Sequence, residues 1–228
     1  DRDFFVINRF GTVSLRDPGN FDVVPATLRY EGSRALIYVD DRDVADVDDA
    51  DVQQIGARFD SQVHPATVDA FGAESDLDAN GRVMILLSRA VNALTTQEIF
   101  DEGARIVGFF FGSDLNHHAT LNPFSNDGEV FYAVVPDPDK LYGAARVSTE
   151  EYPDLAVGVF AHEFEHMISF NHHVLIARGP QDPNLFGVPT EPYGFSNGAR
   201  GMFGPPSFDA AAFEVDARAP VAVRVPLD

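Results

Sequence analysis

The stretch of residues 155–164 constrains the fold more than any other part of the sequence, because a helix formed by it has hardly any polar side before its histidines. A helix that is apolar nearly all round is buried in the core of a protein. Its start is expected between Ser148 and Pro153, since Ser148-x-x-Glu151 resembles a capping box and proline is tolerated only in the first turn. Gly179-Pro180 is a stop signal, so the helix can extend as far as Arg178.

Runs of β-branched and aromatic residues predict the strands of this chain. Two short strands are expected at 4–10 and 12–17, and four more precede the buried helix, at 34–40, 82–88, 104–111 and 129–135. A further helix is expected at 48–63, because apolar residues recur there at helical spacing and Pro65 lies beyond its end. After the buried helix, Gly and Pro predict loop over 179–208, and alternating apolar residues predict one or two strands within 213–227.

This order of elements predicts an α+β fold in which a twisted mixed sheet packs against the buried helix. We expect an N-terminal β segment at 1–25, the main domain at 26–178, and a loop-rich and β C-terminal segment at 179–228.

The net charge of the chain limits the classes of molecule that it is expected to bind. The formal net charge is −20, with Lys140 as the single lysine, so nucleic acid is not an expected partner. No apolar run approaches the length that spans a membrane, and no signal peptide is evident. The absence of cysteine excludes disulfides and thiolate metal ligands. The many carboxylates suit either solubility or hard cations such as calcium.

His162-Glu163-x-x-His166 on the buried helix is the strongest functional signal. Histidines four residues apart lie on one helix face, about 5–6 Å apart at Cβ, and can share a tetrahedral zinc ion. Glu163 lies about 100° round the helix, where it can take a proton from a water beside the ion. With 7 His and 11 Glu in 228 residues, such a pattern arises by chance in roughly 1 chain in 100. Hydrogen-bonded core histidines are the alternative.

Segments around this motif resemble the hyicolysin-like neutral metalloproteases, a family of secreted bacterial zincins. The resemblance covers roughly residues 27–176 and rests on ALIYVDD, FDSQV, SDLDANGRVMILLS, the Ser125, Asn126, Glu129 and Tyr132 element, FYAVV and AHEFEHMISFN. It implies a zincin-like fold, zinc bound by His162 and His166, and Glu163 as general base. It further implies cleavage of proteins or peptides outside a bacterial cell or at its surface.

A catalytic zinc usually has three protein ligands, and the third is not evident here. Related zincins take it from a Glu within a W-L-N-E-G-like segment, but this chain has no Trp. Glu191 lies 25 residues after His166 and is the preferred candidate, although the Gly and Pro around it predict loop. Asp182 and Glu214 are weaker candidates, and a ligand outside this sequence is a further alternative.

His172 is the alternative third ligand. It falls where metzincins place a third histidine, and Met202 would then form the Met-turn. That pattern requires a glycine at the position of Ser169 to end the helix. If the helix continues, His172 is rotated by about 280° from His162 and about 240° from His166, and so faces elsewhere.

A second cation site is expected at Asp76-x-Asp78-x-Asn80-Gly81, which has the alternating oxygens and the glycine of a calcium loop. The twelfth position, where an EF-hand has a bidentate Glu, is Leu87, so the segment is not an EF-hand. A shorter calcium loop and a polar turn are the two interpretations that remain.

Two functions follow from these observations. The first is a secreted zinc metalloendopeptidase in which zinc polarises the scissile carbonyl and Glu163 activates water, with the substrate backbone added to an edge strand at 129–135 or 105–111. The second is a degenerate zincin, a non-catalytic cation-binding module that is secreted or held at the cell surface.

Overall fold

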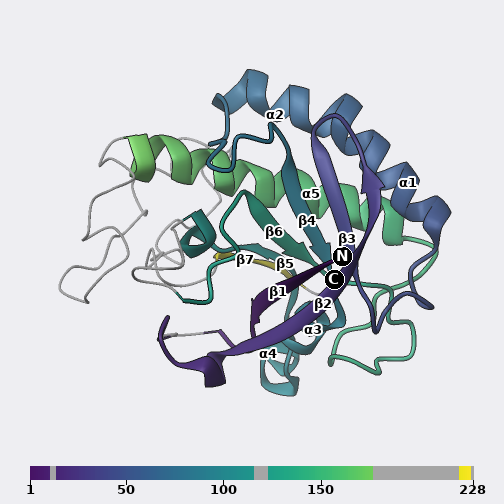
Figure 1. The fold of residues 1–228 in the computed structure, drawn as a ribbon. Helices are drawn as coiled ribbons and strands as arrows, with labels where there is room; N and C mark the ends of the chain where they lie inside the picture. The colour runs from purple at the N-terminus through teal and green to yellow at the C-terminus, as the bar shows by residue number, and fades with distance from the viewer. Residues whose placement is uncertain (11–13, 116–122, 177–220, 227–228) are drawn as a thin grey trace.

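Seven strands form one mixed sheet in the order β1-β2-β3-β4-β6-β5-β7 in the computed structural model, which describes residues 1–10, 14–115, 123–176 and 221–226 (Figure 1). The neighbours β3–β4 and β4–β6 are parallel, and the other pairs are antiparallel. The strands are β1 (Arg2–Ile7), β2 (Phe21–Glu31), β3 (Ala35–Asp40), β4 (Val83–Leu87), β5 (Ala104–Phe110), β6 (Val130–Ala133) and β7 (Val221–Pro226).

Helices lie on both faces of this sheet (Figure 1). The helices α1, α2 and α5 cover one face, and the short helices α3 and α4 lie on the other. Single turns of 3-10 helix follow β1 and β5, and π-helical turns follow α1 and α5. The bounds are α1 (Asp49–Arg58), α2 (His64–Phe71), α3 (Arg89–Ala93), α4 (Gln97–Asp101) and α5 (Tyr152–Phe170), with 3-10 turns at Pro18–Asn20 and Gly112–Leu115 and π turns at Phe59–Val63 and Asn171–Ile176.

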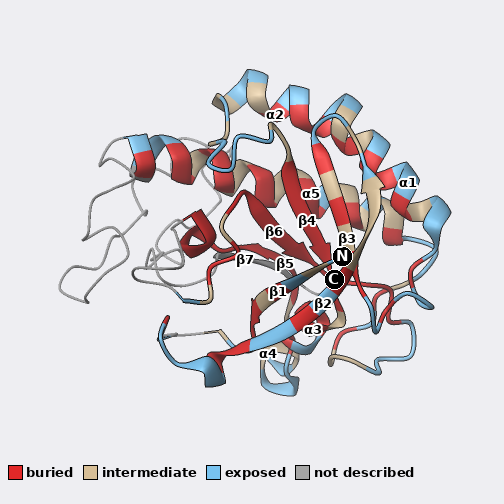
Figure 2. Cartoon of the chain, in the orientation of Figure 1, coloured by how far each residue is buried: buried red, intermediate tan, exposed pale blue. Residues whose placement is uncertain are grey.

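The four strands predicted before the buried helix are confirmed as β3, β4, β5 and β6. All five residues of β4 are buried, because this central strand has a parallel neighbour on each side and helices on each face (Figure 2). β7 confirms a strand in the C-terminal segment. The loop predicted at 179–208 lies outside the described residues.

Two predictions for the N-terminal region were wrong. Residues 14–17 form no strand, and Asp17 instead caps the 3-10 turn by accepting a hydrogen bond from the backbone N–H of Gly19. The long strand β2 was missed, because its one Pro and its uneven alternation weaken the strand pattern. β2 also crosses the boundary expected between residues 25 and 26.

The helix predicted to stop before Pro65 continues as α2 to Phe71, so that end point was wrong. The five-residue π turn Phe59–Val63 separates α1 from α2 and places Pro65 within the first turn of α2. Proline is tolerated in a first turn, where its missing N–H has no partner to lose.

The buried helix is α5, and it begins within the predicted interval with Pro153 in its first turn. The predicted capping box was wrong, because Glu151 occupies the N-cap without a side-chain hydrogen bond. A tertiary contact holds this end of the helix instead: the buried Tyr152 hydroxyl donates to the backbone oxygen of Val134, 3.0 Å away.

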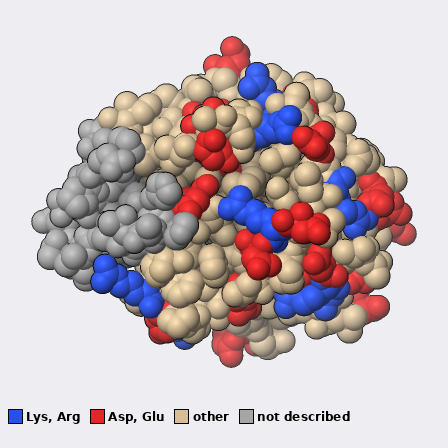
Figure 3. All heavy atoms as spheres, in the orientation of Figure 1, with Lys and Arg blue, Asp and Glu red and all other residues tan. Residues whose placement is uncertain are grey.

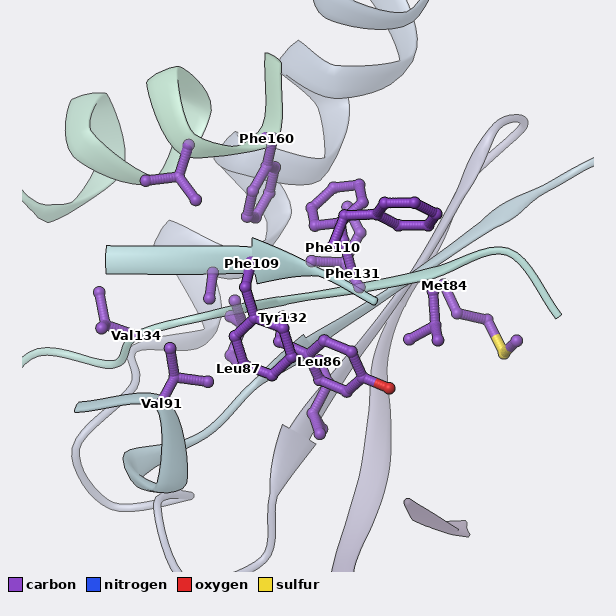
Figure 4. Close-up of a cluster of buried hydrophobic side chains, with 14 of the residues drawn as sticks. Met84, Leu86, Leu87, Val91, Phe109, Phe110, Phe131, Tyr132, Val134 and Phe160 are labelled. Atoms are coloured by element: carbon purple, nitrogen blue, oxygen red, sulfur yellow. The ribbon is translucent and has the colours of Figure 1, made fainter. Parts of the chain in front are cut away.

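Aromatic packing fixes α5 on the sheet. Figure 4 shows Phe160 pointing from the helix towards Phe131, and their ring centroids are 5.5 Å apart. On the opposite face of the sheet, Phe109 and Tyr132 stack with centroids 4.4 Å apart. Consecutive residues of a strand, such as Phe131 and Tyr132 of β6, therefore pack on opposite faces of the sheet.

The interior position of β6 contradicts the expectation that residues 129–135 form an edge strand. β6 pairs with β4 on one side and with β5 on the other. The remaining side of β5 pairs with β7, so 105–111 offers no free edge either. β7 thus occupies the edge of β5 at which the sequence predicted that a substrate backbone could pair.

Asp114 is expected to make stability depend on pH. It is fully buried, and burial raises its pKa to about 7 despite hydrogen bonds donated by Tyr132 and Asn126. The folded-state pKa lies above the ordinary value of 3.8, so the folded state binds more protons and the free energy of unfolding falls as pH rises from about 4 to about 7. Its contribution is at most about 4 kcal/mol.

Urea unfolding at several pH values, compared between the wild type and Asp114→Asn, measures this contribution. The variant has a lower absolute stability, because its amide nitrogen cannot accept a hydrogen bond. Its stability should nevertheless fall less between pH 4 and 7 than that of the wild type. Parallel curves for the two proteins would contradict the prediction.

The surface carries charges of both signs. On the face drawn in Figure 3, Arg and Lys side chains lie among the Asp and Glu side chains. None of the described helices has the length and apolar character needed to cross a bilayer.

Candidate metal centre

His162 and His166 lie side by side on α5, as their spacing predicts. Their Nε2 atoms are 2.8 Å apart, and the ring centroids are 4.5 Å apart with the planes at 79°. Burial lowers the pKa of both imidazoles, and that of His166 is lowered further by its neighbour. Both rings are therefore neutral at neutral pH, the form in which histidine binds a metal ion.

The two imidazoles suit zinc in chemistry and closely in spacing. Two nitrogen ligands of a tetrahedral zinc ion are about 3.3 Å apart, given Zn–N bonds of about 2.0–2.1 Å. The observed separation of 2.8 Å is about 0.5 Å shorter than this.

Glu163 lies inside the protein without exposed surface. Neither of its carboxyl oxygens makes a hydrogen bond of normal geometry with the described residues. Burial raises the pKa of Glu163 well above its ordinary value, and the nearby backbone N–H of Phe110 offsets this only in part. A buried carboxyl group in this state is costly, and a bound cation is a compensation that fits it.

A glycine in β5 allows α5 to approach the sheet at this point. A Cβ atom at Gly108 would lie 2.4 Å from Cγ1 of Val159, 2.9 Å from the backbone oxygen of Tyr132 and 3.4 Å from Oε1 of Glu163. The carboxyl group of Glu163 therefore lies against the backbone of β5. The sequence does not single out Gly108, because a lone glycine in an apolar strand carries no signal of what it faces.

The described residues do not supply a third ligand beside the two histidines. Within that part of the chain, no His, Asp or Glu forms a group of three with His162 and His166. Glu191, the preferred candidate, lies outside the described residues, as do Asp182, Met202 and Glu214.

His172 does not join the two histidines, so the structure does not support the metzincin arrangement. The helical backbone continues through Ser169 and passes into the π turn Asn171–Ile176. This carries His172 round to α2, where a Cβ atom at Gly72 would lie 2.6 Å from its Nε2. The helical rotation expected from the sequence explains this direction.

A second group of potential ligands forms around the predicted calcium loop. Asp76 and Asp78 come together as expected, but the third member is Glu129, just before β6. Asn80 bonds within the loop: its amide donates to Asp78, and its side-chain oxygen accepts from the backbone N–H of Arg82. In the sequence, Glu129 stands out only as part of the Ser125 to Tyr132 element, and nothing there links it to the loop.

Two comparisons with known proteins bear on this site. Over 169 residues the chain is 29% identical to "Neutral metalloprotease ShpI" of Staphylococcus hyicus. The matched stretch covers 74% of this chain and 34% of that protein. The chain thus spans about a third of the length of the curated relative it matches. A family described as "Uncharacterized protein conserved in bacteria" (DUF2141) matches residues 178–222, most of which lie outside the described residues.

The stretch matched to the metalloprotease must include the His162 to His166 motif of α5. Wherever it begins, a stretch of 169 residues in a chain of 228 contains positions 162–166. The paired histidines and the buried glutamate therefore lie in the part of the chain that is distantly related to a neutral metalloprotease.

Proposed function

We propose that this chain is a zinc-dependent endopeptidase whose centre is formed by His162, Glu163 and His166. The observation that carries the proposal is the geometry on α5, where two neutral imidazoles lie 2.8 Å apart and the next residue along the helix is a fully buried glutamate whose carboxyl oxygens make no hydrogen bond of normal geometry with the described residues. A buried carboxyl group is costly without a compensating charge, and a divalent cation held by the two neighbouring imidazoles would supply one. The distant relationship to a neutral metalloprotease supports the same class of reaction.

Each residue has a separate role in this proposal. His162 and His166, whose Nε2 atoms lie side by side on a helix packed against the core, would hold the ion. A bound zinc ion supplies a Lewis acid and lowers the pKa of a nearby water towards 7. Glu163 takes the proton from that water at a carboxyl oxygen and passes it to the leaving amine. The substrate class is proteins or peptides, cleaved outside the bacterial cell.

The third ligand in this proposal is Glu191, which the sequence favours. The substrate backbone would not extend the sheet at β6, which is interior, or at the side of β5 that pairs with β7. Binding at β5 by strand addition requires β7 to leave that position.

Zinc content tests the metal site directly. The wild-type protein, loaded with zinc and dialysed, is expected to hold about one zinc ion per chain, and His166→Ala is expected to lose it, because the loss of one of three ligands weakens zinc binding. Elemental analysis of both proteins measures this.

His172→Ala is the matched control, since this exposed histidine lies against α2 and not beside the other two. It should retain the zinc content of the wild type. Equal zinc in the wild type and His166→Ala would end the zinc proposal.

A non-catalytic cation-binding module is the second candidate. The carboxylate group of Asp76, Asp78 and Glu129 favours it, since this group offers cation ligands away from the paired histidines. Zinc binding without any peptide hydrolysis would identify the protein as such a module.

A further inference from the structure

We propose that Asp76, Asp78 and Glu129 bind one calcium ion. An oxygen atom of each carboxylate lies within 4.8 Å of the others. Asp76 and Asp78 are exposed residues of the connection between α2 and β4, and Glu129 directly precedes β6. This site does not depend on the proposed peptidase activity.

The buried carboxylate of Glu129 is the observation that points to a ligand. Glu129 is only 1% exposed. Its Oε1 accepts hydrogen bonds from the Ser75 hydroxyl at 2.6 Å and from the backbone N–H of Leu77 at 3.0 Å. Its Oε2 is buried and has no hydrogen-bond partner among the described residues. An unpaired buried oxygen on a carboxylate that is grouped with two further carboxylates calls for a cation.

Backbone hydrogen bonds of the loop hold the carboxylates of Asp76 and Asp78 in place and leave lone pairs free for an ion. Asp76 accepts from the backbone N–H of Gly81 at 3.0 Å, and Asp78 accepts from that of Asn80 at 3.1 Å. A carboxylate has about four lone-pair sites, so both retain accepting capacity. The nearby Arg82 side chain forms an ion pair with Glu31, at an N–O distance of 2.8 Å.

The donor set selects the ion. All three side chains supply oxygen, which favours a hard cation over zinc. Calcium accepts irregular oxygen geometries at the surface, whereas magnesium demands a near-ideal octahedron and keeps more of its water. The remaining positions around a calcium ion would be filled by water from the exposed side of the loop.

A bound ion would join two segments that are distant in sequence. The backbone N–H of Met84, at the start of β4, donates to the backbone oxygen of Glu129 at 2.7 Å. The proposed site lies at the end of this β4–β6 pairing. Calcium there would tie the loop to the central sheet and stabilise the folded state.

Thermal unfolding of the zinc-loaded full chain with and without calcium chloride tests this inference. At calcium concentrations about 100-fold above Kd, Tm is expected to rise by roughly 5–10 °C, because the ion binds only the folded protein. Calorimetric titration should give about one calcium ion per chain. Glu129→Gln and the exposed Asp76→Asn should each weaken binding by about tenfold or more.

Glu31→Gln is the matched control, since it removes the same charge near the loop without touching the three carboxylates. It should bind calcium like the wild type. The proposal is overturned if calcium produces no shift, if all variants respond alike, or if magnesium at equal concentration produces the same shift. The zinc content of His162 and His166 is a separate readout, so failure of one site leaves the other testable.

Discussion

Glu163→Gln is expected to reduce peptide hydrolysis by about 10²–10⁴-fold, the typical contribution of a positioned general base. Glutamine has nearly the same shape, but its amide cannot take a proton from water. The zinc content should stay at the wild-type level, because His162 and His166 are unchanged. Hydrolysis of a casein-like substrate, with zinc measured on the same samples, separates the loss of catalysis from the loss of metal.

Glu165→Gln is the control, because it makes the same change on α5 two residues away. It should retain most of the activity, since Glu165 is not a proposed participant. A similar loss in both variants would assign the effect to the helix as a whole. Full activity in Glu163→Gln would exclude Glu163 as the base, and a wild type that binds zinc without hydrolysis would leave the cation-binding module.

Gly108→Ala is expected to destabilise the protein by about 1–3 kcal/mol through overpacking. The added Cβ would lie 2.4 Å from Val159 and 2.9 Å from the backbone oxygen of Tyr132, so α5 must move away from β5. Since Glu163 lies at the same contact, activity should fall as well. Urea unfolding measures the change in the free energy of unfolding.

Gly158→Ala provides the matched comparison within α5. A Cβ atom at Gly158 would meet nothing within 4 Å, and alanine is favoured over glycine inside a helix by up to about 1 kcal/mol. The two Gly→Ala variants should therefore differ by about 1–4 kcal/mol, in opposite directions from the wild type. Equal stabilities would contradict the close approach of α5 to β5.

Elements with a strong local pattern were predictable from the sequence. The continuous apolar run of β4 indicates burial on both faces, and all five of its residues are buried. The helix α5 forms where the sequence predicts it, but only nine of its 19 residues are buried, so the expectation of burial nearly all round was wrong. The short helices α3 and α4 were missed, because each is only five residues long, too short for a helical period to show. Their N-cap residues, Ser88 and Thr96, are the local sequence signals that indicate where these two helices begin.

The sequence by itself determined the pairing of His162 with His166, because a four-residue spacing on a helix fixes two side chains on one face whatever the rest of the chain does. The direction of His172 followed from the sequence only on condition that the helix continues past Ser169, and the structure shows that it does. Only the tertiary structure decided that Glu129 joins Asp76 and Asp78, and that β7 pairs with β5. Both contacts join segments far apart in the chain, and no local period or propensity specifies which distant segments the packing of the sheet brings together.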